Sequence, residues 1–79
     1  EVIFFRLSPK SWGSTEIMLH AADECVVVMH GTLEYHVNGN VFTIQEGGSI
    51  YVPSNIPHNL YNPDEYNEVQ AYGFISPPI

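Results

Sequence analysis

Apolar and polar positions follow the short period of β-strands along most of this chain. Strand-like segments, either alternating or continuously apolar, are separated by turn residues such as Gly, Pro and Asn. The predicted strands are residues 2–7, 25–29, 33–37, 41–44, 49–52 and 68–75, and a further strand begins at His58. No segment of useful length has a helical period. Several short strands at intervals of about ten residues predict an all-β sandwich or barrel.

The clearest local signal is the Asn38-Gly39 pair, because both residue types accept the positive φ of a two-residue type I′ hairpin turn. Pairing outward from this turn sets Tyr35 opposite Phe42 on an apolar face, while His36 lies on the polar face. The complete expected register pairs Val37 with Asn40, His36 with Val41, Tyr35 with Phe42, Glu34 with Thr43 and Leu33 with Ile44. The sequence therefore predicts a half-buried hairpin.

The strand at residues 25–29 is apolar on both faces, which predicts that it is covered from two directions. A chain of 79 residues forms one domain, spanning residues 1–79, with a thin core. Folding of such a chain buries only about 60% of its extended surface. We therefore expect a homodimer in which a second copy covers one sheet.

Charge excludes several kinds of partner. Nine Asp and Glu residues stand against Arg6 and Lys10, for a formal net charge of -7, so nucleic acid and anionic membranes are not expected partners. No apolar run approaches the roughly 20 residues of a membrane helix. Cys25 is the only cysteine, which excludes an intrachain disulfide and fits a reducing cytoplasm.

Candidate chemistry gathers around two histidines and a glutamate. Met18 and His20 are two residues apart, so on a strand their side chains point to one side, about 7 Å apart. Glu24 reaches the same side if residues 21–23 form a tight turn or bulge. His58 opens a strand of the second half. Together His20, Glu24 and His58 would line a pocket with two imidazoles and one carboxylate.

These spacings resemble the two motifs of the cupin superfamily, G-x5-H-x-H-x3/4-E-x6-G and G-x5-P-x-G-x2-H-x3-N. The resemblance covers about two thirds of the chain, and every spacing from His20 onward is met. The residues that carry it are Met18, His20, Glu24 and Gly31 in the first motif, and Gly47, Pro53, Asn55, His58 and Asn62 in the second. The resemblance implies a small cupin β-barrel or jelly roll of antiparallel strands.

Three positions depart from the family pattern. Asn55 replaces a Gly, which is mild because Asn tolerates a left-handed backbone. Gly13 is one residue closer to the first motif than its opening Gly should be. Met18 replaces the first metal-binding His, and a thioether suits Cu(I) better than Fe(II), Mn(II) or Zn(II). Either the remaining two-His, one-carboxylate set binds metal with a more open coordination sphere, or the barrel no longer needs metal.

The resemblance implies a metal-binding enzyme with dioxygenase-, isomerase- or lyase-type chemistry on a small oxygen-rich metabolite. Its cofactor would be a divalent transition metal (Fe, Mn, Ni, Zn or Cu) held by His20, Glu24 and His58, with Met18 as a weaker candidate. The alternative is a non-catalytic small-ligand-binding or sensory cupin domain that has lost its metal. We expect Tyr35, Phe42 and Tyr51 either to line the pocket or simply to fill the barrel.

The remaining reactive side chains have simpler interpretations. His30 is too far along its strand to share a metal with Glu24, and His36 belongs to the outer face of the hairpin. Cys25 has the opposite strand parity to Glu24, so it faces away from the pocket as a small apolar residue. Trp12 lies in a loop, where it caps the barrel or reaches a partner.

Overall fold

The computed structural model describes residues 1–13 and 21–77, and within these ranges the chain forms seven strands and no helix. The strands are β1 (Val2–Leu7), β2 (Asp23–His30), β3 (Leu33–Val37), β4 (Asn40–Ile44), β5 (Ser49–Val52), β6 (His58–Tyr61) and β7 (Val69–Ser76). Every strand pair is antiparallel. The all-β prediction is confirmed, with strand boundaries shifted by one or two residues. In the described ranges no helix is suited by length and hydropathy to span a bilayer.

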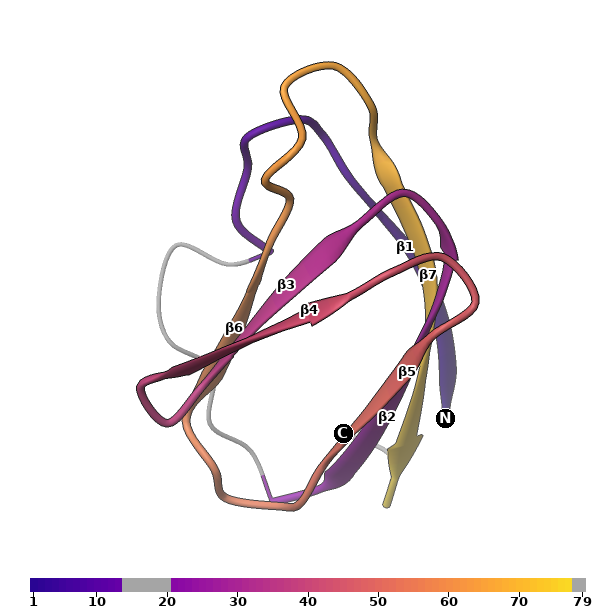
Figure 1. Ribbon diagram of the computed structural model, residues 1–79. Helices are drawn as coiled ribbons and strands as arrows, with labels where there is room; N and C mark the ends of the chain where they lie inside the picture. The colour runs from indigo at the N-terminus through magenta and orange to yellow at the C-terminus, as the bar shows by residue number, and fades with distance from the viewer. Residues whose placement is uncertain (14–20, 78–79) are drawn as a thin grey trace.

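The strands form two sheets that face each other (Figure 1). One sheet has the order β1-β7-β2-β5 and the other the order β4-β3-β6. The chain passes between the sheets after β2, after β4, after β5 and again after β6. Residues far apart in sequence are thereby brought to the space between the two layers, as in a jelly roll.

The hairpin of β3 and β4 has the register that its turn predicts. Tyr35 pairs with Phe42, and the other four pairs also match the expected register. Asn38 and Gly39 have φ angles of 48° and 84°, the left-handed conformation that a type I′ turn requires. The Asn38-Gly39 turn therefore fixes which side chains of β3 face the core.

The core lies between the sheets, and β2 and β7 contribute alternate residues to it. On β2, Val26 and Val28 are 0% exposed, and on β3 Leu33 is also fully buried. The buried apolar cluster comprises Leu7, Val26, Val28, Leu33, Tyr35, Ile44, Val52, Leu60, Val69 and Ala71. Burial of these side chains contributes most of the stability of so small a fold.

The two faces of β2 differ within a single chain. Glu24, Val26 and Val28 point into the core, whereas Cys25 and Val27 on the opposite face are only partly buried. A bulge between Val28 and His30 ends the regular pairing of β2 with β7. The sequence predicts that both faces of this strand are covered. The second sheet covers the inner face, and the outer face is accessible in a single chain.

Candidate functional site

Glu24 places a carboxylate inside the core. It lies near the start of β2 with the same parity as Val26, and its residue is only 8% exposed. Its neighbours in the sheet are Val52 of β5 and Ile75 of β7, both apolar and buried. Transfer of a carboxylate into such surroundings is costly unless it has polar partners. Two polar side chains reach Glu24 from the opposite sheet.

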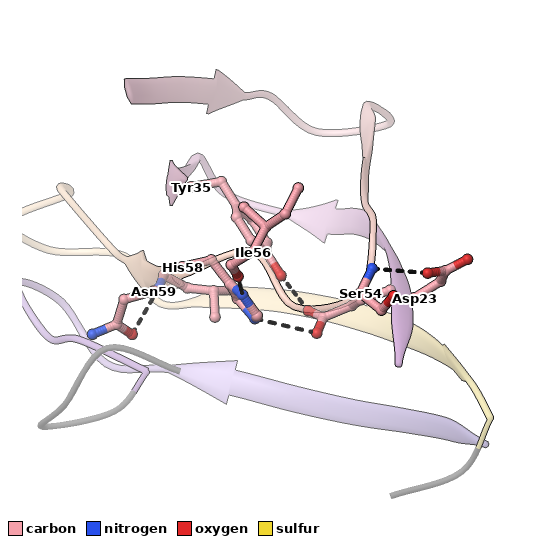
Figure 2. Close-up of polar contacts among 8 residues, drawn as sticks. Asp23, Tyr35, Ser54, Ile56, His58 and Asn59 are labelled. Carbon is pink, nitrogen blue, oxygen red and sulfur yellow. Dashed lines mark hydrogen bonds and ion pairs between the residues drawn. The ribbon is translucent and has the colours of Figure 1, made fainter. Parts of the chain in front are cut away.

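The first partner is Tyr35, whose hydroxyl donates a hydrogen bond to Glu24 Oε1 (Figure 2). Tyr35 is 0% exposed and lies at the centre of β3. Burial raises the pKa of the Tyr35 hydroxyl far above its usual range, and the hydrogen bond to the Glu24 carboxylate raises it further. Tyr35 therefore stays protonated and acts as a fixed donor to the carboxylate.

The second partner is His58, the first residue of β6. Its Nε2 lies 3.6 Å from Glu24 Oε2, and its ring stacks on that of Tyr35 with centroids 5.8 Å apart. The interaction with the Glu24 carboxylate is the main cause of a raised His58 pKa, although burial acts against it. Glu24, Tyr35 and His58 thus form one buried polar cluster that joins the two sheets.

Contact with a backbone carbonyl fixes the orientation of the His58 ring. Nδ1 lies 2.8 Å from the carbonyl oxygen of Ile56 (Figure 2). Because a carbonyl only accepts, Nδ1 carries the proton in this contact and donates it. In the neutral ring, Nε2 then carries the lone pair, which is the form that binds a metal ion, whereas in the protonated ring the Nε2–H group faces Glu24. A histidine whose second nitrogen donates to a backbone carbonyl is the usual arrangement of a metal ligand.

The loop before β6 sets this geometry. Asn55 has a φ of 61°, the left-handed conformation expected for the residue that replaces a motif Gly. The chain then turns so that Ile56 can accept the bond from His58. Further on, Asn62 is 0% exposed and donates from Nδ2 to the carbonyl oxygens of Leu7 and Asn67. Asn62 therefore holds the far ends of the strands together rather than contributing to the polar cluster.

The structure brings together only part of the predicted site. Glu24 and His58 adjoin each other, whereas Met18 and His20 lie outside the described residues. Within the described part of the chain, no three His, Cys, Asp or Glu side chains are grouped closely enough to hold a metal ion. The described half of the predicted ligand set is therefore a pair, Glu24 and His58.

The three aromatic residues expected at the pocket have different surroundings. Tyr35 contacts both Glu24 and His58. Phe42, although opposite Tyr35 in the sheet, is 49% exposed, and Tyr51 is 59% exposed. The sequence marked Tyr35 only as a possible lining residue, and its direct bond to Glu24 was not foreseen. The one sequence feature that could have indicated a buried Tyr35 is its central position on the apolar face of the hairpin.

The two histidines that the sequence places outside the site, His30 and His36, do lie away from the polar cluster. The His30 side chain is 56% exposed and faces Glu46 at 3.3 Å. His36 faces Glu34 at 3.0 Å on the outer side of β3. Its ring also packs edge-on against Trp12, with centroids 4.8 Å apart.

The donor atoms of Glu24 and His58 suit a first-row transition metal. Carboxylate oxygen and neutral imidazole nitrogen are both ordinary ligands of Zn(II), Fe(II) and Mn(II). Two ligand atoms that each lie about 2.1 Å from one ion are about 3.0 to 3.5 Å apart. The 3.6 Å between His58 Nε2 and Glu24 Oε2 is close to this separation. The pair therefore fits a metal that is completed by further ligands.

Comparison with known proteins identifies the fold. The Cupin_2 family model, described as a cupin domain, matches residues 3–72. No curated protein matches the chain. A conserved protein of unknown function from Streptococcus pyogenes superposes with a TM-score of 0.86 at 22% identity. The superposition covers 99% of this chain and 64% of the Streptococcus chain.

Two further solved structures have names that point to different functions. A predicted oxalate decarboxylase from Thermotoga maritima has a TM-score of 0.82 at 20% identity, covering 94% of this chain and 63% of its own. The Cupin_2 domain of an XRE-family transcriptional regulator from Enterobacter cloacae has a TM-score of 0.83 at 22% identity, covering 99% of this chain and 81% of its own.

At these identities the likeness establishes the fold and no activity. This chain spans less than two thirds of the Streptococcus and Thermotoga proteins. The match to the family model covers most of the 79 residues and includes Glu24, His58 and the hairpin between them. The chain therefore belongs to the Cupin_2 family of cupin domains.

Proposed function

We propose that this cupin domain binds a divalent transition metal (Fe, Mn, Ni, Zn or Cu) through Glu24 and His58, with His20 as the third protein ligand. The observation that carries the proposal is the buried pair itself. Two metal-type donors face each other at 3.6 Å, and the second nitrogen of His58 bonds to the Ile56 carbonyl. A histidine oriented in this way is prepared to present Nε2 to an ion.

The function that this site supports best is an enzyme acting on a small oxygen-rich metabolite, with dioxygenase-, isomerase- or lyase-type chemistry. A bound metal would act there as a Lewis acid or redox centre. Glu24 supplies negative charge to the ion, and Tyr35 holds the carboxylate in place. Glu24 and His58 are only 8% and 3% exposed, so the surrounding core largely excludes water from the pair. The Thermotoga neighbour, a predicted oxalate decarboxylase, supports chemistry on an oxygen-rich substrate.

Metal content and affinity test the proposal directly. The chain would be purified without a metal-affinity tag and analysed for transition metals, then stripped and titrated with Mn(II), Fe(II), Ni(II), Cu(II) and Zn(II). The variants are His58→Ala and Glu24→Gln, and the matched control is His30→Ala at an exposed histidine. We expect about one equivalent in the wild type and in His30→Ala, and a loss of at least tenfold in affinity in the other two.

Circular dichroism and urea unfolding of each variant separate loss of metal from loss of fold. Binding of less than a tenth of an equivalent by folded wild type with every ion would contradict the proposal. Equal affinity in wild type and Glu24→Gln would also exclude Glu24 as a ligand. Candidate substrates should then be screened only with the metal ion that the wild type retains.

The second candidate function is a sensory domain that binds a small ligand without metal. The observation in its favour is the regulator cupin domain, of which this chain covers 81%, the largest share among the three structures compared above. Such a domain would bind its ligand equally well with and without chelator, and His58→Ala would change ligand affinity without changing metal content. Cytoplasmic location and the absence of nucleic-acid and membrane partners stay predictions from the charge and the single cysteine.

A further inference from the structure

The side chains next to His58 on the inner side of its sheet are apolar. In the ladder between β3 and β6, Val37 pairs with His58. Ile56 lies two residues before His58 and accepts the bond from its ring (Figure 2). Val37 and Ile56 both pack against the core and are only partly buried. A molecule bound beside His58 therefore meets hydrocarbon on this side.

Phe42 adds an accessible aromatic ring to these apolar neighbours. It pairs with Tyr35, and directly paired residues of an antiparallel ladder share one face of the sheet. Tyr35 is 0% exposed and donates to Glu24, whereas Phe42 lies on β4 at the edge of its sheet and is 49% exposed. The Phe42 ring is therefore one cross-strand step from the residue that holds the carboxylate, and it remains accessible to a ligand.

No Lys or Arg side chain lies near the Glu24 carboxylate. Arg6 and Lys10 are the only residues of these types in the sequence. The Arg6 side chain is 64% exposed, and Lys10 is exposed in the loop after β1. On β7, Gln70 pairs with Arg6 and Ile75 pairs with Glu24, so on the order of 17 Å of strand separates the two levels of the sheet. An anionic group bound near Glu24 therefore has no fixed positive side chain beside it.

The other described histidines already face acidic side chains. His30 lies 3.3 Å from Glu46, and His36 lies 3.0 Å from Glu34 on the outer side of β3. Neither histidine points towards the polar cluster, so neither can hold an anionic group there. Within residues 1–13 and 21–77, the proposed metal is thus the one centre left to neutralise an anionic group of a bound molecule.

We propose that the substrate of this site carries a single anionic oxygen group and an apolar arm, and that Phe42 contacts the arm. This inference rests on the proposed function, because the metal at Glu24 and His58 would bind the anionic group. The arm loses surface to water where it packs on Phe42, Val37 and Ile56. A second anionic group, as in a dicarboxylate or a phosphorylated sugar, would be repelled by a chain of net charge -7 with no cation to offset the repulsion. Phe42 is thus a specificity-determining residue.

Four α-hydroxycarboxylates test this proposal, because they share one metal-binding head group and differ only in the arm. Glycolate has no arm, phenyllactate has a phenyl arm, malate has a second carboxylate and 3-phosphoglycerate has a phosphate. Each is titrated calorimetrically against protein loaded with the metal ion that the wild type retains. We expect phenyllactate to bind at least about tenfold more tightly than glycolate, and malate and 3-phosphoglycerate to bind no more tightly than glycolate.

Phe42→Ala and Phe42→Lys test the residue, with Val41→Ala and Val41→Lys as matched controls. Val41 is 55% exposed on the same strand but has the opposite parity, so it faces away from the polar cluster. Phe42→Ala should lower the affinity for phenyllactate to that for glycolate. Phe42→Lys supplies the missing cation and should strengthen binding of malate and 3-phosphoglycerate at least about tenfold. Both Val41 variants should keep the wild-type order, and circular dichroism and metal content should be unchanged in all four.

Failure of this inference can be distinguished from failure of the proposed function. A wild type that retains metal but binds malate or 3-phosphoglycerate as tightly as phenyllactate would overturn the inference alone, as would equal losses in Phe42→Ala and Val41→Ala. A wild type that retains no metal would contradict the proposed function, and the four probes are then titrated against the metal-free chain. Phenyllactate should still bind most tightly and weaken in Phe42→Ala, because neither cause of the preference involves the ion. Absence of that preference in the metal-free chain would overturn the inference as well.

Discussion

Two tyrosine–carboxylate hydrogen bonds begin on neighbouring residues of β2 and lie on opposite sides of the sheet. Glu24 points inward and accepts from Tyr35, whereas Asp23 points outward and accepts from Tyr51 at 2.5 Å. The two contacts are chemically alike. Tyr35 is 0% exposed and Tyr51 is 59% exposed. The comparison separates the effect of the bond from the effect of its surroundings.

The surroundings decide what each pair can do. Burial is the main cause of the raised pKa of Tyr35, while the raised pKa of Tyr51 comes mainly from its bond to Asp23. Water can replace the outer bond at little cost. The inner bond has no such substitute, and His58 extends it into a cluster that links both sheets. The same functional groups therefore form a weak surface contact on one side and a candidate site on the other.

The largest expected difference is in stability without metal. Tyr35→Phe leaves Glu24 Oε1 without its buried donor, which costs about 1 to 3 kcal/mol of unfolding free energy. Tyr51→Phe removes the exposed equivalent and should cost much less, because water can take the place of the hydroxyl group. Urea unfolding of both variants in the presence of a chelator measures the two losses. Equal losses would show that burial does not distinguish the two bonds.

The next largest difference between the two tyrosines is expected in metal affinity, if the domain binds metal as proposed. Without the Tyr35 hydroxyl, the Glu24 carboxylate can rotate away from His58. Loss of such an outer-shell partner typically weakens metal binding about 10- to 100-fold. Tyr51→Phe should leave the affinity unchanged. Competition with a chromophoric chelator measures both variants, and an unchanged affinity in folded Tyr35→Phe would remove Tyr35 from any role in positioning the carboxylate.

Comparison of these two pairs also shows how far the sequence could predict the molecule. The β3–β4 hairpin was predicted residue by residue, because Asn38-Gly39 permits one turn and thereby one register. The meeting of Glu24 and His58 followed from motif spacing alone. Local signals of this kind depend on few residues that are close together in sequence or belong to a recurrent pattern.

The contacts of the tyrosines could not be predicted in the same way. Strand alternation assigns Tyr35 and Phe42 to one face, but it does not show how far the opposite sheet extends over that face. Tyr35 is covered and Phe42 is not, because burial depends on how β3 and β4 lie against the other layer. The bond from Tyr35 to Glu24 likewise crosses between sheets, where neither turn chemistry nor register applies.

A smaller effect is expected from pH, through the inner cluster. The ion-pair contact with Glu24 raises the pKa of His58 above its unfolded value of about 6.5. The stabilisation is therefore complete below that value and is lost as the pH rises through the higher folded pKa. Metal-free protein should become less stable from about pH 6 towards pH 8. His58→Gln should reduce this slope and His30→Ala should keep it, as thermal unfolding would show.

The smallest effect belongs to the outer pair, and it has the opposite sign. The hydrogen bond from Tyr51, and then that from the Ser54 amide, lowers the pKa of Asp23 below its usual value of about 3.8. Its contribution is present above that value and is lost as the pH falls through the lower folded pKa. The thermal midpoint of the wild type should slightly exceed that of Asp23→Asn at neutral pH, and the difference should shrink below about pH 3. Because Asp23 is partly exposed to solvent, salt should also reduce the difference. An acid-side loss as large as the Tyr35→Phe effect would contradict this comparison, because it would mean that the outer bond is shielded from water as well as the inner one is.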